Sequence, residues 1–488
     1  MAAHVLARAA QMPDKTALSV IGPHGARTWT FAEVDAAVRG IATGLRARGL
    51  APGDIVLLRL GNTPEFPLAY LGAIAAGCLP VPTSSQLTEP EVTGIIHDLK
   101  PGLILHEPGI ACPDHPTRLD VKALAPMHDL PPADYHMGDP NRPGYIVYTS
   151  GTSGQPRAVL HAHRAIWARQ MMMQGWYGLT SADRLLHAGA FNWTYTLGTG
   201  IMDPWTVGAT ALIPEPGTAP ADLPALLRAH KATLFAAAPG VYRQMLKQDD
   251  PFALPDLRHA LAAGEKLSPA LRQAWEDRTG TPIFEAYGMS ECSTFISASP
   301  SQPAVGDALG TPQKGRRIAI LGPDGPVPRG QPGVIAVHKE DPGLMLEYLH
   351  APHDTAERFQ GDWLLTGDQG RMNQNDQIHY LGRADDMMNA GGYRVSPIEV
   401  EQALATHPGI DAVGCAEVTI KADTSVIAAF YTGPRALRDD DLSGFAAQRL
   451  ARYKCPRMYI YLDELPTGPN GKLLRRSLKS LAPDVSHG

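Results

Sequence analysis

The sequence predicts an α/β protein with a large N-terminal domain of βαβ-type sheets and a smaller α+β C-terminal domain, joined by a hinge. Three observations support this prediction. Short apolar runs alternate with helical patterns along the first part of the chain, a separate pattern of helices and strands begins near residue 386, and a charged, Gly-rich stretch lies between the two parts. We therefore expect one domain over residues 1–384 and a mobile second domain over residues 385–488.

The alternation is clearest early in the chain. The runs "DIVLLRL" (54–60) and "LPVPT" (79–83) have the length and composition of buried strands, and "EFPLAYLGAIAAG" (65–77) between them is typical of a buried helix. The next segment, "VTGIIHDLKPGLILHE" (92–107), predicts a helix followed by a strand. Strands that are separated by helices usually pair in parallel, so these segments predict a parallel sheet.

The C-terminal part has its own set of elements. The segment "VSPIEVEQALATHPGIDAVGCAEV" (395–418) predicts a helix and a strand, and "TSVIAAFYTG" (424–433) predicts a second strand. Another helix and strand are expected within "DLSGFAAQRLARYKCPRMYIYLDELP" (441–466). The join "GRADDMMNAGGYR" (382–394) is charged and Gly-rich, as a hinge should be.

Composition and charge exclude several classes of function. The net charge of −6 and pI near 6.3 give no basic field that would attract nucleic acid or anionic lipid. The five cysteines are far apart, and no CxxC pair or HExxH motif occurs, so we expect no disulfide framework and no zinc site. The longest apolar stretch is too short to span a bilayer, and the N-terminus lacks the apolar core of a signal peptide. A cytoplasmic protein is therefore expected.

The segment "YIVYTSGTSGQPRAV" (145–159) raises the question of function. Its apolar run leads into Thr, Ser and Gly residues from Thr149 to Gly154, and Arg157 follows. Glycine lets backbone N–H groups come close to an anion and the hydroxyls add donors, so a triphosphate is a suitable ligand. The spacing does not fit the P-loop pattern GxxxxGK[ST]. A flexible Ser/Gly linker is the alternative, which the strand pattern before the loop and the helical pattern "HAHRAIWARQMMM" (161–173) after it disfavour.

The loop resembles the phosphate-binding signature of the adenylate-forming superfamily, which includes acyl-CoA synthetases, the adenylation domains of peptide synthetases and beetle luciferases. Further motifs follow in the family's order. "EAYGMSE" (285–291) is similar to the adenine and magnesium motif, "LTGDQG" (365–370) to the ribose motif, "GRADDMMNAGGYRVSPIEVE" (382–401) to the hinge and the loop after it, and "PTGPNGKLLR" (466–475) to the terminal motif of the catalytic lysine. The resemblance covers essentially the whole chain and implies ATP-dependent activation of a carboxylic acid through acyl-AMP.

The resemblance implies a role for residues in each motif. The expected catalytic residues are Lys472, Glu291 and Arg383: Lys472 would stabilise the charge that builds between the α-phosphate and the carboxylate, and Glu291 would hold Mg²⁺. Tyr287 would stack on adenine, and Asp368 would accept from the ribose hydroxyls. The complete set expected to contact ATP or AMP is Thr149, Ser150, Gly151, Thr152, Ser153, Gly154, Arg157, Gly264, Glu265, Glu285, Ala286, Tyr287, Gly288, Ser290, Asp368, Arg383 and Lys472.

The acid and the acceptor thiol have their own expected residues. The acid pocket is expected to include Asn192, Trp193, Gly288 and Met289, and the hinge and coenzyme A loop to include Asp385, Gly391, Gly392 and Tyr393. Relatives that use acetate place Trp at the position of Gly288, so the glycine predicts room for a larger acid; alternatively, it serves only a tight turn and other side chains close the pocket. The basic run "RYKCPR" (452–457) is expected to be a solvated helix face, with contact to coenzyme A phosphates as the alternative.

Departures from the family pattern limit the choice of acid. Asn192 stands where adenylation domains for α-amino acids carry an Asp against the ammonium group, so an amino-acid substrate is not expected. Asn389 stands where some relatives have a second Lys, which argues against a luciferase-like use of that position.

These observations predict an AMP-forming acyl-CoA synthetase for a medium-chain aliphatic or aryl acid, with ATP, Mg²⁺ and coenzyme A as cofactors and cosubstrates. The alternative is a stand-alone adenylation enzyme that loads an acyl or aryl group onto a carrier-protein thiol. A nucleotide-binding protein without catalysis is a third hypothesis, which the joint presence of Glu291, Asp368, Arg383 and Lys472 disfavours. The expected partners are a small carboxylic acid and coenzyme A, without nucleic acid or a membrane span, in a monomer or homodimer.

Overall fold

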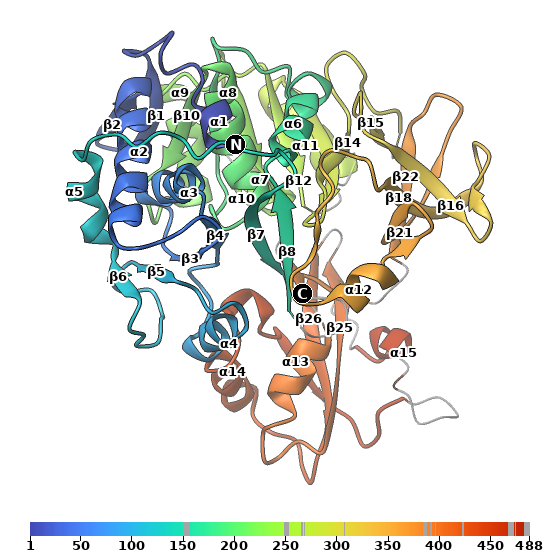
Figure 1. Cartoon of the computed structure of the whole chain (residues 1–488). Coiled ribbons are helices and arrows are strands. Elements are labelled where there is room, and N and C mark those ends of the chain that lie inside the picture. Colours follow the sequence, from blue (N-terminus) through green and yellow to red (C-terminus); the bar gives the residue numbers. More distant parts are fainter. Residues whose placement is uncertain are drawn as a thin grey trace.

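The computed structural model of the chain describes residues 1–149, 156–247, 253–264, 267, 269–306, 308–383, 388–390, 393–395, 397–421, 424–466, 473 and 475–482. Figure 1 shows a large body above a smaller C-terminal part, with the predicted mixture of helices and sheets in both. The predicted fold class is therefore confirmed. Among the described residues, no helix has the length and apolar character needed to cross a bilayer, as the sequence predicts.

The first sheet has the strand order β4-β3-β5-β6, and its neighbouring strands run parallel as predicted. Its strands are β3 (Ile55–Arg59), β4 (Leu79–Pro82), β5 (Leu103–His106) and β6 (Arg118–Asp120). Helix α3 (Glu65–Ala76) is buried from Phe66 to Ala76 because it is apolar on all sides, and it ends at Gly77 in the left-handed conformation. Helices α2 (Phe31–Ala47) and α4 (Glu89–Leu99) both begin with a capping box, formed in α4 by Thr88 and Glu91.

A long sheet forms the centre of the large body. Its parallel half comprises β1 (Thr16–Gly22), β10 (Thr210–Pro214), β9 (Arg184–His187), β11 (Leu234–Ala237), β12 (His259–Ala263) and β13 (Ile283–Met289), with β2 (Gly25–Thr30) antiparallel at the edge. Its antiparallel half comprises β14 (Ser293–Ser297), β15 (Ala308–Pro312), β22 (Ile378–Arg383), β21 (Trp363–Met372), β18 (Pro332–His338), β16 (Ile318–Gly322), β17 (Gly325–Pro326) and β20 (Phe359–Gln360). The pairing changes from parallel to antiparallel between β13 and β14, where the "EAYGMSE" motif lies.

The Thr/Ser/Gly segment joins two antiparallel strands, β7 (Pro143–Thr149) and β8 (Arg157–Ala162), and β19 (Glu347–Tyr348) extends this hairpin. Strand β8 was not predicted, whereas the expected helix after the loop is present within residues 161–173. Residues 157–162 pair with β7, and helix α6 (Ala165–Met172) begins only after them.

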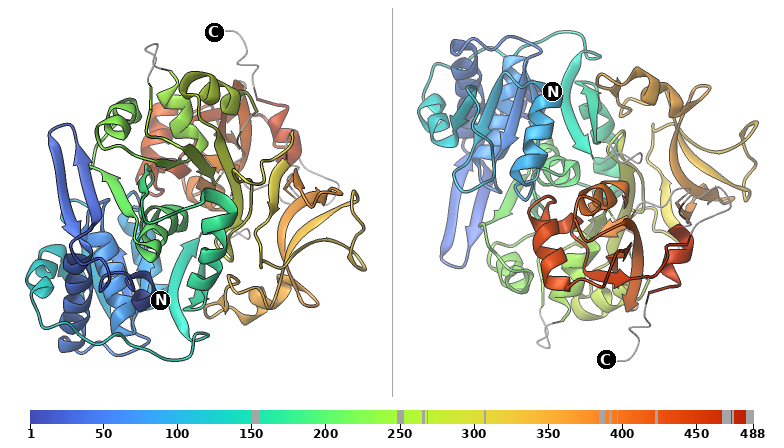
Figure 2. Two further views of the ribbon diagram at one scale, coloured as in Figure 1. Left: turned by 90° about the horizontal axis from the view of Figure 1, so that it is seen from above. Right: turned by 90° about the horizontal axis from the view of Figure 1, so that it is seen from below.

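The remaining helices of the large body cover the sheets (Figures 1 and 2). They are α1 (Ala2–Val5), α5 (Ala125–His128), α7 (Thr194–Leu197), α8 (Asp203–Val207), α9 (Leu223–Ala229), α10 (Pro239–Met245), α11 (Pro269–Thr279) and α12 (Pro352–Glu357), with the short helical turns η1 (Val121–Leu124), η2 (Met173–Tyr177), η3 (Gly198–Met202) and η4 (Pro220–Asp222).

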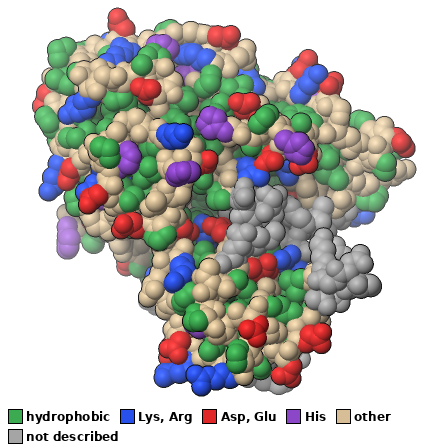
Figure 3. Space-filling view, turned by 60° about the horizontal axis from the view of Figure 1, so that its bottom comes forward, with side chains coloured by type: hydrophobic (Ala, Val, Ile, Leu, Met, Phe, Trp, Pro, Cys, Tyr) green, Lys and Arg blue, Asp and Glu red, His purple; other side chains and the backbone are tan. Residues whose placement is uncertain are grey.

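The C-terminal part contains the predicted helices and strands. A hairpin of β23 (Met388–Ala390) and β24 (Tyr393–Val395) precedes the sheet β25 (Ala412–Lys421), β26 (Thr424–Thr432) and β27 (Met458–Tyr461), which carries α13 (Pro397–Leu404), α14 (Asp439–Ala447), η5 (Arg452–Lys454) and α15 (Arg475–Lys479). In the space-filling view the molecule narrows between this part and the large body (Figure 3).

The basic run in the C-terminal part is a solvated face only in part: Arg452 and Arg457 are exposed as expected, but Lys454 is not. Lys454 is buried, and its Nζ lies 3.1 Å from Glu91 Oε1 of α4 in the large body and 2.7 Å from Glu399 Oε1 of α13. Ala451 and Tyr453 pack into an apolar cluster with residues of the large body. The C-terminal part is therefore docked by apolar contacts around a buried, paired lysine.

Candidate active site

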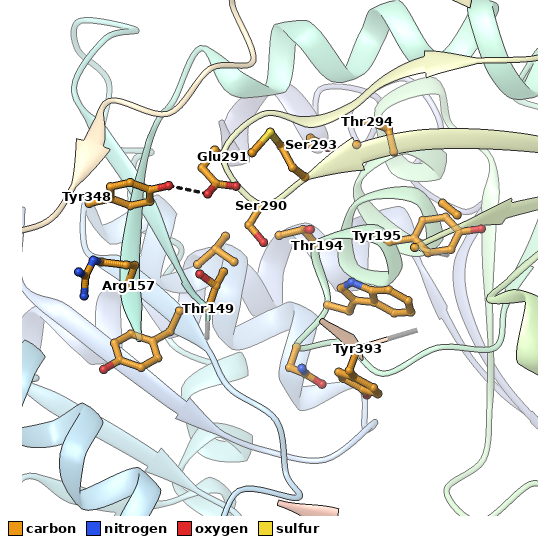
Figure 4. Close-up of a pocket in the computed structure, with 18 of the residues that line it drawn as sticks. Thr149, Arg157, Thr194, Tyr195, Ser290, Glu291, Ser293, Thr294, Tyr348 and Tyr393 are labelled. Carbon is orange, nitrogen blue, oxygen red and sulfur yellow. Dashed lines mark hydrogen bonds between the residues drawn. The ribbon is translucent and has the colours of Figure 1, made fainter. Parts of the chain in front are cut away.

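The candidate site is a cavity of about 350 Å³ that lies between the β7–β8 hairpin, the end of β13 and the C-terminal part. Figure 4 shows that Arg157 and Glu291 lie on one side, Tyr195 and Tyr393 on the other, and Ser290 between them. The predicted site residues that line this cavity are Thr149, Arg157, Asn192, Trp193, Gly264, Gly288, Met289, Ser290, Glu291 and Tyr393. The structure therefore brings together residues from motifs that are far apart in the sequence.

The phosphate side of the cavity is set by the hairpin. Thr149 and Arg157 face each other at the last pair of the β7–β8 ladder, so the loop between them leaves the sheet at the cavity. Arg157 forms an ion pair with Asp354 of α12, which holds the guanidinium beside this loop. The loop residues Ser150, Gly151, Thr152, Ser153 and Gly154 lie outside the described residues.

The magnesium side of the cavity contains a fixed carboxylate. The Tyr348 hydroxyl donates a 2.6 Å hydrogen bond to Glu291 Oε1, and the backbone N–H of Met345 donates to the Glu291 carbonyl. Burial, together with the neighbouring Glu291, raises the pKa of Tyr348, which keeps it a donor. Since a carboxylate has two oxygens, the second oxygen of Glu291 can bind a hard cation from the cavity.

His161 fixes the neighbouring residue of the same motif. Its Nε2 donates a 2.7 Å hydrogen bond to the Ser290 carbonyl, and its ring stacks on Tyr145 with centroids 4.7 Å apart. Burial lowers the pKa of His161 to about 4, so the imidazole is neutral near pH 7. A neutral ring that donates from Nε2 holds the Ser290 backbone in place.

The nucleotide side joins two motifs. The Tyr287 hydroxyl donates to Asp368 Oδ2, and the Tyr287 ring packs edge-on against Phe295 with centroids 5.4 Å apart. Asp368 of β21 lies opposite Arg383 of β22 in the sheet register. The structure therefore brings together the predicted adenine, ribose and catalytic positions, although Tyr287 and Asp368 do not line the cavity itself. Only the backbone of Arg383 is described.

Glu285 and Ala286 do not line the cavity, unlike the later residues of their motif from Gly288 to Glu291. Glu285 is 2% exposed, accepts a 3.0 Å hydrogen bond from the Leu267 backbone and pairs with Arg272 at 3.3 Å, and Ala286 is buried in an apolar cluster. Alternation along β13 points these two side chains to opposite faces of the sheet, and both faces are covered there. Glu285 thus holds the backbone of Leu267 in place. Gly264 lines the cavity with a φ of 97° that favours glycine.

The acid side of the cavity has aromatic walls. The Trp193 and Tyr195 rings meet edge to face with centroids 5.7 Å apart, and Tyr195 donates to the Leu261 carbonyl at 3.1 Å. Asn62 fixes the loop before them, since its amide donates to the Gly189 carbonyl and accepts from the Phe191 backbone. These contacts place flat apolar surfaces opposite Ser290 (Figure 4).

Gly288 lines the cavity, but a side chain there would not point into open space. A Cβ atom would lie 2.5 Å from Thr294 Cα and closer still to the Ser293 carbonyl, so any other residue would force the β14 backbone to shift. The ladder has an irregularity between Tyr287 and Gly288. The glycine therefore permits β13 and β14 to approach each other closely. This role differs from both expectations, which were room for a larger acid and a tight turn.

The C-terminal part contributes an aromatic stack to the cavity. The Tyr393 ring stacks between Trp193, with centroids 5.8 Å apart, and Tyr453, with centroids 4.0 Å apart. Both tyrosines line the cavity. The other residues predicted for the loop, hinge and catalytic lysine, namely Glu265, Asp385, Gly391, Gly392 and Lys472, lie outside the described residues.

Sequence reasoning missed several residues that line the cavity. They are Arg169, Thr194, Thr199, Ser293, Tyr348 and Asp354. One signal was present: Arg169 is a charged residue on the buried face of a mainly apolar helix. A buried charge needs a partner, and that partner can be found only in the folded chain.

Two family models match the chain. That of the AMP-binding enzyme matches residues 5–349, and that of the AMP-binding enzyme C-terminal domain matches residues 399–472. Fold and site together define an ATP-dependent acid–thiol ligase that forms AMP. The chain belongs to the AMP-binding enzyme family.

Individual relatives are more distant. The chain is 29% identical to the sulfoacetate–CoA ligase of Cupriavidus necator, over 98% of this chain and 97% of that one. It is 27% identical to a 3-hydroxybenzoate–CoA ligase of Aromatoleum sp., over 94% and 92%. Among solved structures, the o-succinylbenzoate-CoA synthetase of Bacillus subtilis, bound with a product analogue, has a TM-score of 0.85 at 23% identity, with 98% of each chain covered.

Proposed function

We propose that this enzyme activates an aryl or medium-chain carboxylic acid as acyl-AMP and transfers the acyl group to coenzyme A. One observation carries the proposal: a single cavity is lined by a cation and a carboxylate suited to ATP and Mg²⁺, by aromatic walls suited to an apolar acid, and by Tyr393 from the C-terminal part. The relatives named above are CoA ligases for acids of different size and polarity, which supports coenzyme A as the acceptor and leaves the acid open.

The residues present fit ATP and Mg²⁺. Glu291, with one oxygen held by Tyr348, together with hydroxyl groups such as Thr149 and Ser290, offers the hard oxygen ligands that Mg²⁺ prefers. When bound, Mg²⁺ neutralises phosphate charge. Arg157, held by its ion pair with Asp354, offers guanidinium N–H donors to a phosphate at this edge of the cavity. We propose that Lys472 completes the site by stabilising the charge that develops at the α-phosphate.

The acid would lie between Ser290 and the aromatic walls. Trp193 and Tyr195 present flat surfaces that favour an aromatic ring or a methylene chain, and they exclude water from the carboxylate end. In-line attack needs the carboxylate close to the α-phosphate, which the position of Ser290 between the two sides favours. The stack of Trp193, Tyr393 and Tyr453 would then border the path of the incoming thiol.

A pyrophosphate-release screen tests the proposal. Benzoates and straight-chain acids of two to ten carbons would be supplied with ATP and Mg²⁺, with and without coenzyme A, and thioester would be measured by mass spectrometry. We expect acid-dependent pyrophosphate release and a thioester only when coenzyme A is present. Acyl-AMP without any acyl-CoA would favour the carrier-protein alternative, and no pyrophosphate release with any acid would refute the proposal.

Other properties remain proposals. We propose that the enzyme is cytoplasmic, because its five cysteines are free thiols and a reducing compartment would keep them so. We also propose that it is a monomer or a homodimer. Size-exclusion chromatography with light scattering would decide the oligomeric state.

A further inference from the structure

The acid side of the cavity ends in polar groups rather than in the aromatic surfaces that begin it. Arg169, Thr199 and Ser293 line this end, which we call the polar end. Ser293 lines both the main cavity and the smaller cavity next to it, together with Ser290 and Arg169. An acid whose carboxylate lies near Ser290 would direct its opposite end toward these groups.

Arg169 is the charged group of the polar end, and an adjacent carboxylate neutralises it. Its Nε and Nη2 donate to the two oxygens of Asp203, at 2.8 and 2.6 Å, and Nη2 also donates to Thr199. Arg169 is 5% exposed and Asp203 is fully buried, and the Tyr177 hydroxyl donates to the same carboxylate. The polar end therefore has hydrogen-bond donors but no net positive charge.

Ser293 connects this ion pair to the cavity. Arg169 Nη1 donates a 2.8 Å hydrogen bond to Ser293 Oγ, so the serine hydroxyl is an acceptor to the arginine and keeps its own proton to donate. Ser293 has a φ of 57°, an unfavourable backbone conformation for a residue with a side chain. Such conformations gather at functional sites, where the surrounding structure enforces them.

A second, small cavity of about 20 Å³ adjoins the polar end. It shares Arg169, Thr194, Ser290 and Ser293 with the main cavity, and its other walls include Tyr70, Leu197 and Met202. This volume suffices for about one water molecule, and so for a substituent the size of a hydroxyl group. Larger substituents would meet the apolar walls.

We propose that the polar end selects an acid that has an uncharged hydroxyl group at the end opposite its carboxylate, a hydroxyaryl acid above all, and that Ser293 and Arg169 bind this hydroxyl. The proposal rests on the proposed function and specifies its substrate class. A second carboxylate is disfavoured because Asp203 already balances Arg169, so a further anion would be buried without a counter-charge. A purely apolar acid is disfavoured because it would cover the Ser293 hydroxyl without offering an acceptor for its proton.

Five acids and two variants of Ser293 test the proposal. Values of kcat/KM from pyrophosphate release would be compared for benzoate, 3- and 4-hydroxybenzoate, isophthalate and hexanoate. The wild type should prefer one hydroxybenzoate over benzoate by about tenfold or more, the range of one hydrogen bond in a buried site. Ser293→Ala keeps the Cβ atom and removes only the hydroxyl, so it should bring the hydroxybenzoate value down to about that of benzoate. Ser293→Gly accepts the positive φ and serves if the alanine variant folds poorly.

Ser297→Ala is the matched control. Ser297 lies on the same strand and is buried, and its hydroxyl donates to the Gly175 carbonyl without lining the cavity. This variant should keep the wild-type preference. Three results would overturn the inference while the proposed function stands. The wild type could show no preference for a hydroxyl group, it could prefer isophthalate or hexanoate, or the preference could survive in the Ser293 variants. No activity with any acid would refute both.

Discussion

Replacing Lys454 with methionine should weaken the docking of the C-terminal part without destroying the nucleotide side of the cavity. Lys454 lies between Glu399 of its own C-terminal part and Glu91 of the large body, and both carboxylates are largely buried. Its bond to Glu399 persists when the two parts separate, whereas the 3.1 Å bond to Glu91 must break. Only the second bond therefore contributes to docking.

The magnitude follows from that single bond. A hydrogen bond between charged groups contributes about 1.5–3 kcal/mol, which corresponds to roughly ten- to a hundredfold in the docking equilibrium. Methionine has a similar length and can pack beside Tyr453 in the apolar cluster, so the variant should retain most of the buried contact area. The loss should consist mainly of the missing charge pair.

Separate measurements of the two half-reactions would test this prediction. Tyr393 reaches the cavity only because the C-terminal part is docked as it is, so thioester formation from supplied acyl-AMP should fall by roughly ten- to a hundredfold. Pyrophosphate exchange should change little. Lys339→Met removes an exposed lysine paired with Asp362 and should affect neither step. Equal loss in both half-reactions, or no loss in either, would refute the reasoning.

Three further predictions concern single residues. Lys472→Ala should slow acyl-AMP formation by about 10²- to 10³-fold and spare thioester formation from supplied acyl-AMP; equal effects on both steps would contradict its role. Burial lowers the pKa of His161 from 6.5 to about 4. Between pH 6.5 and pH 4 the unfolded chain therefore binds a proton at this residue that the folded chain does not bind. The free energy of unfolding is highest above pH 6.5 and decreases as the pH falls through this range. His161→Gln, which keeps a donor for the Ser290 carbonyl, should reduce the pH dependence of the unfolding free energy by about 1.4 kcal/mol per pH unit in this window, measured by urea denaturation; an unchanged slope would contradict the assignment. Gly288→Ala should lower the unfolding free energy by about 1–3 kcal/mol, because its Cβ meets the β14 backbone, and a variant as stable as the wild type would show that the strands can separate there.

The sequence by itself determined the periodic elements and the residue types of the site. Alternating apolar runs and helical patterns predicted the parallel strands β3, β4 and β5 and the helix α3 between them, because these patterns reflect the local geometry of each element. The family resemblance named Glu291, Ser290 and Arg157, and these line one cavity. Such features depend on residues that are close together in the sequence.

Only the tertiary structure decided which side chains face one another. Glu285 belongs to the same motif as Glu291, yet it is buried against Arg272. Gly288 is required by a strand that approaches it rather than by an open pocket. Arg169 lies in a mainly apolar helix and Lys454 in a basic run, and their partners Asp203 and Glu91 lie 34 and 363 positions away in the sequence. The physical reason is that a buried charge is stable only beside a partner, and long-range packing, which no local pattern encodes, determines that partner.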